Sequence, residues 1–255
     1  MSHLIKIANL LTVAAFCSIP HNSYTAKLLL EYDVTYKIPP NSESVKRSIE
    51  QHRNSLGDKN DEFLDHLQDR LVSGDSVRFP FVILATIENN RLMAFQMNDY
   101  LPPVGNAVVF HGTDFPKKKR ILCDGKNITE YESKNYGDNV EDPLIKTCEY
   151  KPGELSNCHD FFLQVFLESQ CMLSSAIDDT KPRNDKLQIN RNGDKLNVVA
   201  VSSNGRLTRN ADFIKNENET YVLERFTRTC GIDSQNIENE VEFRLKNVKI
   251  TLGDQ

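Results

Sequence analysis

Apolar and polar residues alternate along much of this 255-residue chain. Over residues 28–38 every second residue is apolar, which predicts a half-buried strand that ends at Pro39-Pro40. The same period returns over residues 76–87, and Pro80 inside this run indicates an edge or a bulge position. One face of the two predicted strands is rich in aromatic and aliphatic side chains, namely Tyr32, Val34, Tyr36, Phe79, Phe81 and Ile83.

Turn signals divide much of the remaining chain into hairpins. The dipeptides Asp124-Gly125, Asn192-Gly193 and Asn204-Gly205 each lie between two strand-like runs. Both central residues of a type I′ turn need positive φ, which Asn, Asp and Gly tolerate, so each dipeptide predicts a tight hairpin. Asn89-Asn90 predicts another turn. Near Asn247, in the last predicted strand, the apolar positions change phase, which indicates a bulge or bend.

Two regions show helical spacing instead. Residues 43–72 carry apolar residues at roughly helical intervals in a charged segment, which predicts one or two amphipathic helices. Residues 156–177 are apolar around most of the helical circumference, which predicts a helix buried on more than one side. A strand over residues 162–167 is the alternative. Because no βαβ alternation occurs, the sequence predicts an α+β fold that is mostly antiparallel β.

The first 26 residues are typical of an export signal. Lys6 precedes a short apolar stretch over residues 10–19, and small polar residues near 23–26 suit a cleavage site. The stretch is too short to span a bilayer, which takes roughly 20 residues of helix. The sequence therefore predicts an exported protein, periplasmic or extracellular, with one β-rich domain over residues 27–255. A buried N-terminal helix is the alternative, and Cys17 leaves lipidation open.

Five further cysteines follow the predicted signal, namely Cys123, Cys148, Cys158, Cys171 and Cys230. In an oxidising compartment they can form two disulfides and leave one thiol. Cys148 and Cys158 are closest in sequence and flank Pro152-Gly153, so they are the first candidate pair. Buried free thiols are the alternative for Cys123 and Cys171.

The sequence contains no recognisable catalytic or metal-binding motif. It lacks the nucleophile-elbow, phosphate-loop, zinc-helix and dinucleotide-binding patterns. The net charge of −5 disfavours nucleic acid or an anionic membrane as a charge-driven partner. We therefore expect a protein that is not an enzyme, binds no cofactor and has no transmembrane span; its oligomeric state stays open. A hydrolase is the alternative if His111 or His159 converges with carboxylates.

The segment Arg120–Ser133 places Asp124-Gly125-Lys126 between two strand-like runs, with Tyr131 in the second. This arrangement resembles the central hairpin of periplasmic lipoprotein carriers of the LolA/LolB-like superfamily. The order of signal, strand, helix, strands, hairpin, central helix and closing strands is similar as well. The resemblance implies a half-barrel of antiparallel strands with helical lids over a hydrophobic cavity for acyl chains. The chain departs from the family in its charged insert, residues 43–72, and in its five cysteines.

Two interpretations of the aromatic strand faces remain. In the first, the faces pack against the helices in a closed core, and the protein is an exported structural or protein-interaction module. In the second, a strongly curved, half-barrel-like sheet is covered by the two helical regions, and its concave face holds an apolar ligand. The second describes an exported, non-catalytic binding protein for a lipid or an acylated protein, and this is the function we expect.

Overall fold

The computed structural model describes residues 25–56, 65, 68–69, 72–100, 119–132, 144–154, 160–178, 186–217, 219–231 and 237–250. Two helices have bounds that the structure describes, α2 (Glu43–Leu56) and α5 (Phe161–Ile177), and residues 65, 68–69 and 72–73 are helical as well. Its strands are β1 (Thr25–Ile38), β2 (Asp75–Glu88), β3 (Arg91–Tyr100), β4 (Lys119–Cys123), β5 (Asn127–Glu132), β6 (Leu144–Glu149), β7 (Lys186–Asn192), β8 (Lys195–Val201), β9 (Leu207–Lys215), β10 (Tyr221–Gly231) and β11 (Ile237–Ile250).

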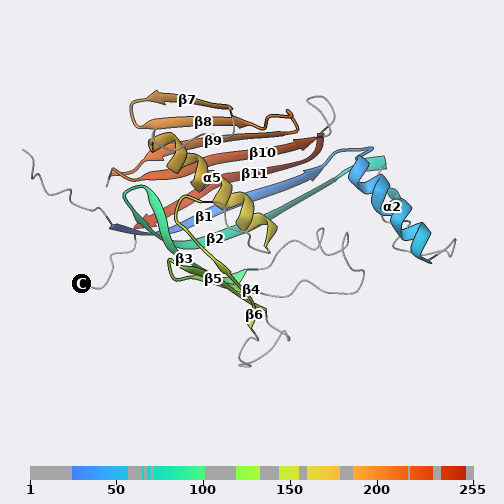
Figure 1. The fold of residues 1–255 in the computed structure, drawn as a ribbon, viewed down its shortest axis with the longest axis horizontal. Coiled ribbons are helices and arrows are strands. Elements are labelled where there is room, and N and C mark those ends of the chain that lie inside the picture. Colours follow the sequence, from blue (N-terminus) through green and yellow to red (C-terminus); the bar gives the residue numbers. More distant parts are fainter. Residues whose placement is uncertain are drawn as a thin grey trace, which may run out of the picture.

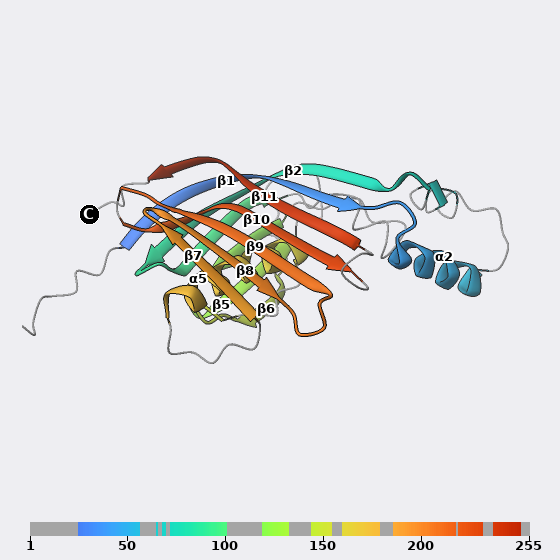
Figure 2. The same cartoon turned by 90° about the horizontal axis from the view of Figure 1, so that it is seen from above.

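The strands form one antiparallel sheet of eleven strands in the order β6-β5-β4-β3-β2-β1-β11-β10-β9-β8-β7. The first and last strands, β1 and β11, therefore lie side by side at its centre, and β6 and β7 form its edges (Figure 1). In sequence α5 lies between the two edge strands, and in space it lies on one face of the sheet (Figure 2). We call this the covered face, and the opposite one the open face.

The central strand β1 confirms the alternation predicted from its sequence. Its residues at every second position from Ala26 to Val34 are buried on the covered face. The strand also begins earlier than predicted, because Thr25 pairs with Glu88 and Ala26 pairs with Ile87. The predicted end of the export signal, after Ala26, thus falls two residues inside β1.

Three local predictions for the central strands are confirmed. Asn89 and Asn90 both have positive φ, 49° and 61°, in the turn between β2 and β3. In the β1–β11 pair, Glu31 faces Asn247 and Tyr32 faces Leu245, so the intervening Lys246 forms the predicted bulge. Pro80 pairs with Asp33 of β1, whereas the pairing between β2 and β3 covers only residues 84–88 of β2; Pro80 therefore lies at a local edge.

The hairpins at the three Asx-Gly dipeptides form, but the expected turn type is wrong at each of them. Gly125 (φ 93°), Gly193 and Gly205 have positive φ, whereas Asp124, Asn192 and Asn204 do not. Instead, the Asp124 carboxylate accepts hydrogen bonds from the backbone N–H groups of Lys126 and Asn127, both at 2.8 Å. Gly125 therefore occupies the first central position, where a type II′ turn takes glycine, and Asp124 holds the turn from the preceding position.

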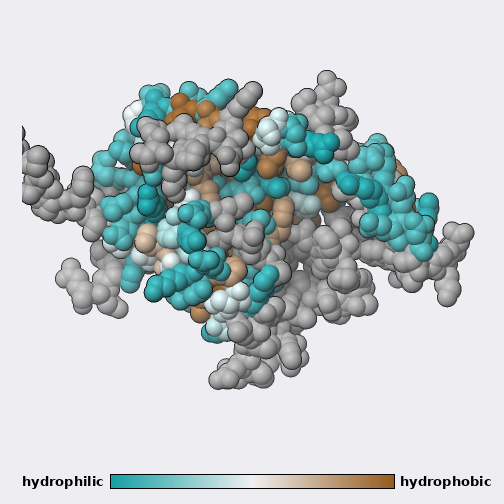
Figure 3. Space-filling view, viewed as in Figure 1, coloured by the Kyte–Doolittle hydropathy of each residue, from teal (hydrophilic) through white to brown (hydrophobic). Residues whose placement is uncertain are grey.

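Both helical regions exist, but only α5 lies over the sheet. The interpretation of residues 162–167 as a strand is wrong, because they form part of α5. α2 extends beyond the ends of β1 and β2 (Figure 1). Its Val45 and Ile49 pack with Ile38 in a separate small cluster. The surface of α2 seen in Figure 3 is largely hydrophilic, and the sequence of the helix contains Val45, Ile49 and Leu56 as its apolar residues, too few for a second apolar stripe.

Candidate functional site

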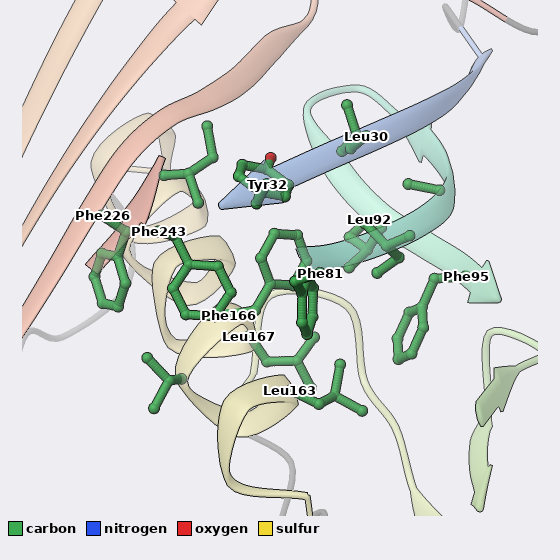
Figure 4. Close-up of a cluster of buried hydrophobic side chains, with 14 of the residues drawn as sticks. Leu30, Tyr32, Phe81, Leu92, Phe95, Leu163, Phe166, Leu167, Phe226 and Phe243 are labelled. Carbon is green, nitrogen blue, oxygen red and sulfur yellow. The ribbon is translucent and has the colours of Figure 1, made fainter. Parts of the chain in front are cut away.

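Aromatic side chains fill the centre of the covered face. Tyr32 of β1, Phe81 of β2 and Phe243 of β11 surround Phe166 of α5 (Figure 4). The ring centroid of Phe166 lies 5.7 Å from that of Tyr32, 5.5 Å from that of Phe81 and 6.2 Å from that of Phe243. These tilted contacts match the separations at which aromatic pairs attract each other. The helix therefore contacts three adjacent central strands through a single side chain.

The six residues predicted to form an apolar surface meet under α5. Five of them are buried in the main hydrophobic cluster, and Tyr36 is partly buried against it. Phe162 of α5 lies 4.6 Å from Phe79 and 5.9 Å from Tyr36, measured between ring centroids. Side chains of the helix thus occupy the space above these residues, which gives the covered face a packed interior in this structure.

Two buried tyrosines on this side of the sheet differ in their hydrogen bonding. The Tyr150 hydroxyl donates to the backbone oxygen of Leu92 at 2.6 Å. The Tyr32 hydroxyl has no hydrogen-bond partner among the described residues. Burial raises the pKa of both phenols above its usual value, so both remain protonated and can act as donors.

Buried charges hold the N-terminal end of α5. Asp160 is the N-cap residue, and its carboxylate accepts a hydrogen bond from the Leu163 backbone N–H at 3.0 Å. The other carboxylate oxygen lies 3.4 Å from Nζ of Lys119, and the Asp160 N–H donates to Glu130 at 3.4 Å. Burial, and then the neighbouring Asp160 charge, raise the pKa of Glu130, against the opposing effect of Lys119. The chain thus brings two carboxylates and one ammonium group from β4, β5 and α5 together.

No pattern noted in the sequence predicted this group of Lys119, Glu130 and Asp160. An Asp directly before an apolar helical run is a helix-start signal, so Asp160 was recognisable. Glu130 lies two positions from the buried Ile128 on β5, and alternation therefore directs both toward the covered face. The role we assign to the group is to attach α5, because one carboxylate already caps the helix.

An open pocket of about 450 Å³ lies at the other end of α5. Its lining comes from the β2–β3 turn and from the last turn of the helix, namely Glu88, Asn89, Asn90, Arg91, Met93, Ser174, Ile177 and Asp178. A guanidinium nitrogen of Arg91 lies 3.5 Å from the Asp178 carboxylate across this pocket. None of the six predicted apolar residues lines it.

One further ion pair fixes the middle of the helix. Nε of Arg228 on β10 lies 3.2 Å from the Glu168 carboxylate, and both side chains are largely buried. The Arg228 guanidinium also lies over the Phe161 ring, 5.6 Å from its centroid. Near the C-terminal end, Arg191 of β7 donates to the backbone oxygen of Ala176 at 2.8 Å. Polar contacts to α5 therefore come from both halves of the sheet.

The described cysteines form no disulfide; they are Cys123, Cys148, Cys171 and Cys230. Cys148 thus has no disulfide in the structure, and Cys158, its predicted partner, lies outside the described residues. His111 and His159, the histidines of the hydrolase alternative, also lie outside them. Within the described part of the chain, no group of three or more His, Cys, Asp or Glu residues could hold a metal ion.

The described helices include none that is both long and apolar enough to cross a membrane.

The chain was compared with known protein families and with curated proteins. No known protein family matches the chain, and no curated protein matches it.

Proposed function

We propose that the chain is an exported, non-catalytic binding protein that holds an apolar group, such as an acyl chain, between the covered face and α5. In this proposal the sheet is a strongly curved half-barrel of the lipoprotein-carrier type, α5 is its lid, and the ligand is a lipid or an acylated protein. The ligand takes the place of helix side chains such as Phe166 on the aromatic centre of the sheet.

The observation that carries the proposal is the way one helix covers this aromatic surface. Phe166 and Phe162 contact the sheet through rings, and hydrophobic contacts of this kind are not directional, so an acyl chain can replace them. The polar attachments of α5 include Lys119–Asp160, the hydrogen bond from the Asp160 N–H to Glu130, Arg228–Glu168, Arg91–Asp178 and the hydrogen bond from Arg191 to Ala176. The sheet order supports the same proposal, because a helix between the two edge strands can cover the face without interrupting the sheet.

A second function is favoured by the complete burial of the aromatic centre. Phe81, Ile83 and Val34 are fully buried without any ligand, as expected for a structural or protein-interaction module with a packed core. In that case partners would contact the open face or the edges of the sheet. The two functions differ in one measurable property, which is whether an apolar ligand reaches the space beneath Phe166.

A single tryptophan can report on that space, because the chain has no Trp. We expect a Phe166→Trp variant to change its emission when lauric acid is added below its micelle concentration. The matched control is Tyr131→Trp on β5, where the ring lies under Arg120 at 4.6 Å rather than under α5. Its emission should stay constant. Urea unfolding of both variants establishes that each is folded before the titration.

Native mass spectrometry of the gently purified, processed chain supplies the second measurement. A lipid that co-purifies and is released by organic solvent supports the binding function. A ligand-free mass, together with an unchanged emission of the Phe166→Trp variant at saturating lipid, would exclude it and favour the interaction module.

A further inference from the structure

The hydroxyl group of Tyr32 lies among the aromatic rings of the covered face, and the packing there leaves it unexplained. Tyr32 is 1% exposed, and its hydroxyl has no hydrogen-bond partner among the described residues. Tyr150, which is 3% exposed, shows the usual arrangement, because its hydroxyl donates to Leu92. A buried hydroxyl without a partner destabilises a fold, whereas phenylalanine would fill nearly the same space without that cost. Buried polar groups of this kind call for a functional explanation.

The surroundings of Tyr32 define what could pair with it. Its ring lies 6.4 Å from Phe81, 5.7 Å from Phe166 and 6.1 Å from Phe243, measured between centroids (Figure 4). An ionised partner would be costly in this apolar setting, because the ring contacts of Tyr32 are with the apolar side chains of Phe81, Phe166 and Phe243. A neutral acceptor, such as a carbonyl oxygen, can accept the hydrogen bond without bringing a charge into the core.

We propose that the Tyr32 hydroxyl donates a hydrogen bond to the carbonyl oxygen of an acyl ester whose chain lies between the covered face and α5. This inference rests on the proposed function and makes it more specific, because it predicts selection for an ester over an ether of equal length. Phe166 of α5 leaves the Tyr32 ring when the ligand enters, and the ester carbonyl then reaches the hydroxyl. The unpaired hydroxyl lowers the stability of the ligand-free protein and contributes to recognition in the complex.

The test uses two probes that differ in one carbonyl group, glyceryl monolaurate and glyceryl dodecyl ether, both below their micelle concentrations. The parent chain should bind the ester about fivefold more tightly, the ratio expected for one neutral hydrogen bond. A Tyr32→Phe variant should bind both probes equally, at the affinity that the parent has for the ether. The same variant should unfold at a higher urea concentration than the parent, because it removes the unpaired hydroxyl.

Tyr150→Phe is the matched control, since it removes a buried hydroxyl that has a partner. It should unfold at a lower urea concentration and keep the preference for the ester. An ester preference that survives in Tyr32→Phe, or a Tyr32→Phe variant less stable than the parent, would overturn the inference. Equal binding of both probes to the parent would also overturn it while leaving the proposed function intact. Binding of neither probe would refute the proposed function together with the inference.

Discussion

The two ends of α5 are attached to the sheet by different chemistry. At the N-terminal end, Asp160 caps the helix and faces Lys119 at 3.4 Å, with side chains that are 3% and 20% exposed. At the C-terminal end, Asp178 faces Arg91 at 3.5 Å, but these side chains are 25% and 48% exposed. An N-cap side chain such as that of Asp160 typically contributes about 1–2 kcal/mol, whereas an exposed ion pair contributes about 0–1 kcal/mol. The N-terminal attachment should therefore be the stronger one.

The helix dipole increases this difference. Asp160 places a negative charge at the positive, N-terminal end of α5, where it stabilises the helix. Asp178 places a negative charge at the opposite end, and the last turn contains no basic residue. If α5 is a lid, as the proposed function requires, it should open from its C-terminal end, beside the pocket, and stay attached at Asp160.

The largest effect should follow the loss of the N-terminal attachment. Asp160→Ala removes the acceptor for the Leu163 N–H and leaves Lys119 with Glu130, 4.0 Å away, as its remaining ion-pair partner in this group. We expect the free energy of unfolding to fall by about 2 kcal/mol, as for the loss of a strong N-cap. Urea unfolding measures this loss, and hydrogen exchange at Leu163 should accelerate with it.

Asp160→Asn separates capping from charge. Asparagine caps helices about as well as aspartate, so the cap should persist while the charge beside Glu130 disappears. We expect a change in unfolding free energy within about 0.5 kcal/mol, because losing the Lys119 attraction is offset by losing the repulsion from Glu130. Equal destabilisation by Asp160→Ala and Asp160→Asn would show that charge, rather than capping, holds this end.

A smaller, pH-dependent effect should come from Glu130. Burial raises the pKa of Glu130 in the folded chain above its ordinary value of 4.5, so the folded state binds this proton more tightly than the unfolded state. The stabilisation from this proton is complete below pH 4.5 and is lost as the pH rises through the raised value. Relative to Glu130→Gln, the parent should therefore gain stability as the pH falls from 7 toward 4.5.

The difference in unfolding free energy between the parent and Glu130→Gln isolates Glu130, because both proteins share the contributions of the other titrating groups. The pKa of Asp33 is lowered, chiefly by its hydrogen bond to Lys246, so its contribution is lost on acidification; both proteins share it. Parallel urea titrations of the parent and of Glu130→Gln at several pH values measure the difference. A flat difference would mean that Glu130 titrates alike in the folded and unfolded chains, and that the N-terminal attachment is insensitive to pH.

Local patterns predicted the elements that local physics determines. The alternation through Tyr32 predicted β1, and the phase change near Asn247 predicted the bulge at Lys246. Asn89-Asn90 predicted a turn because asparagine tolerates positive φ better than most residues. At Asp124, Asn192 and Asn204 the same argument found the hairpin and mistook its turn type, because only the following glycine adopts positive φ. Asp124 contributes through its side chain instead.

Local sequence patterns could not predict the contacts between segments that are far apart in the chain. β1 pairs with β11 across about two hundred residues, and nothing in either strand specifies that partner. For the same reason the sequence could place Tyr32 on an apolar face but could not show that its hydroxyl would lack a partner. The Lys119, Glu130 and Asp160 group likewise depends on how β4, β5 and α5 meet.

The smallest effect should come from the C-terminal end, which completes the comparison. Asp178→Asn removes a weak, exposed ion pair with Arg91, but it also removes a negative charge from the negative end of the helix. Because the two contributions oppose each other, we expect a change in unfolding free energy of at most about 0.5 kcal/mol. Arg91→Gln and the double variant complete a cycle whose coupling energy should also be below about 0.5 kcal/mol. A coupling above about 1 kcal/mol would show that this end is attached as firmly as the N-terminal end, and α5 could then not open preferentially beside the pocket.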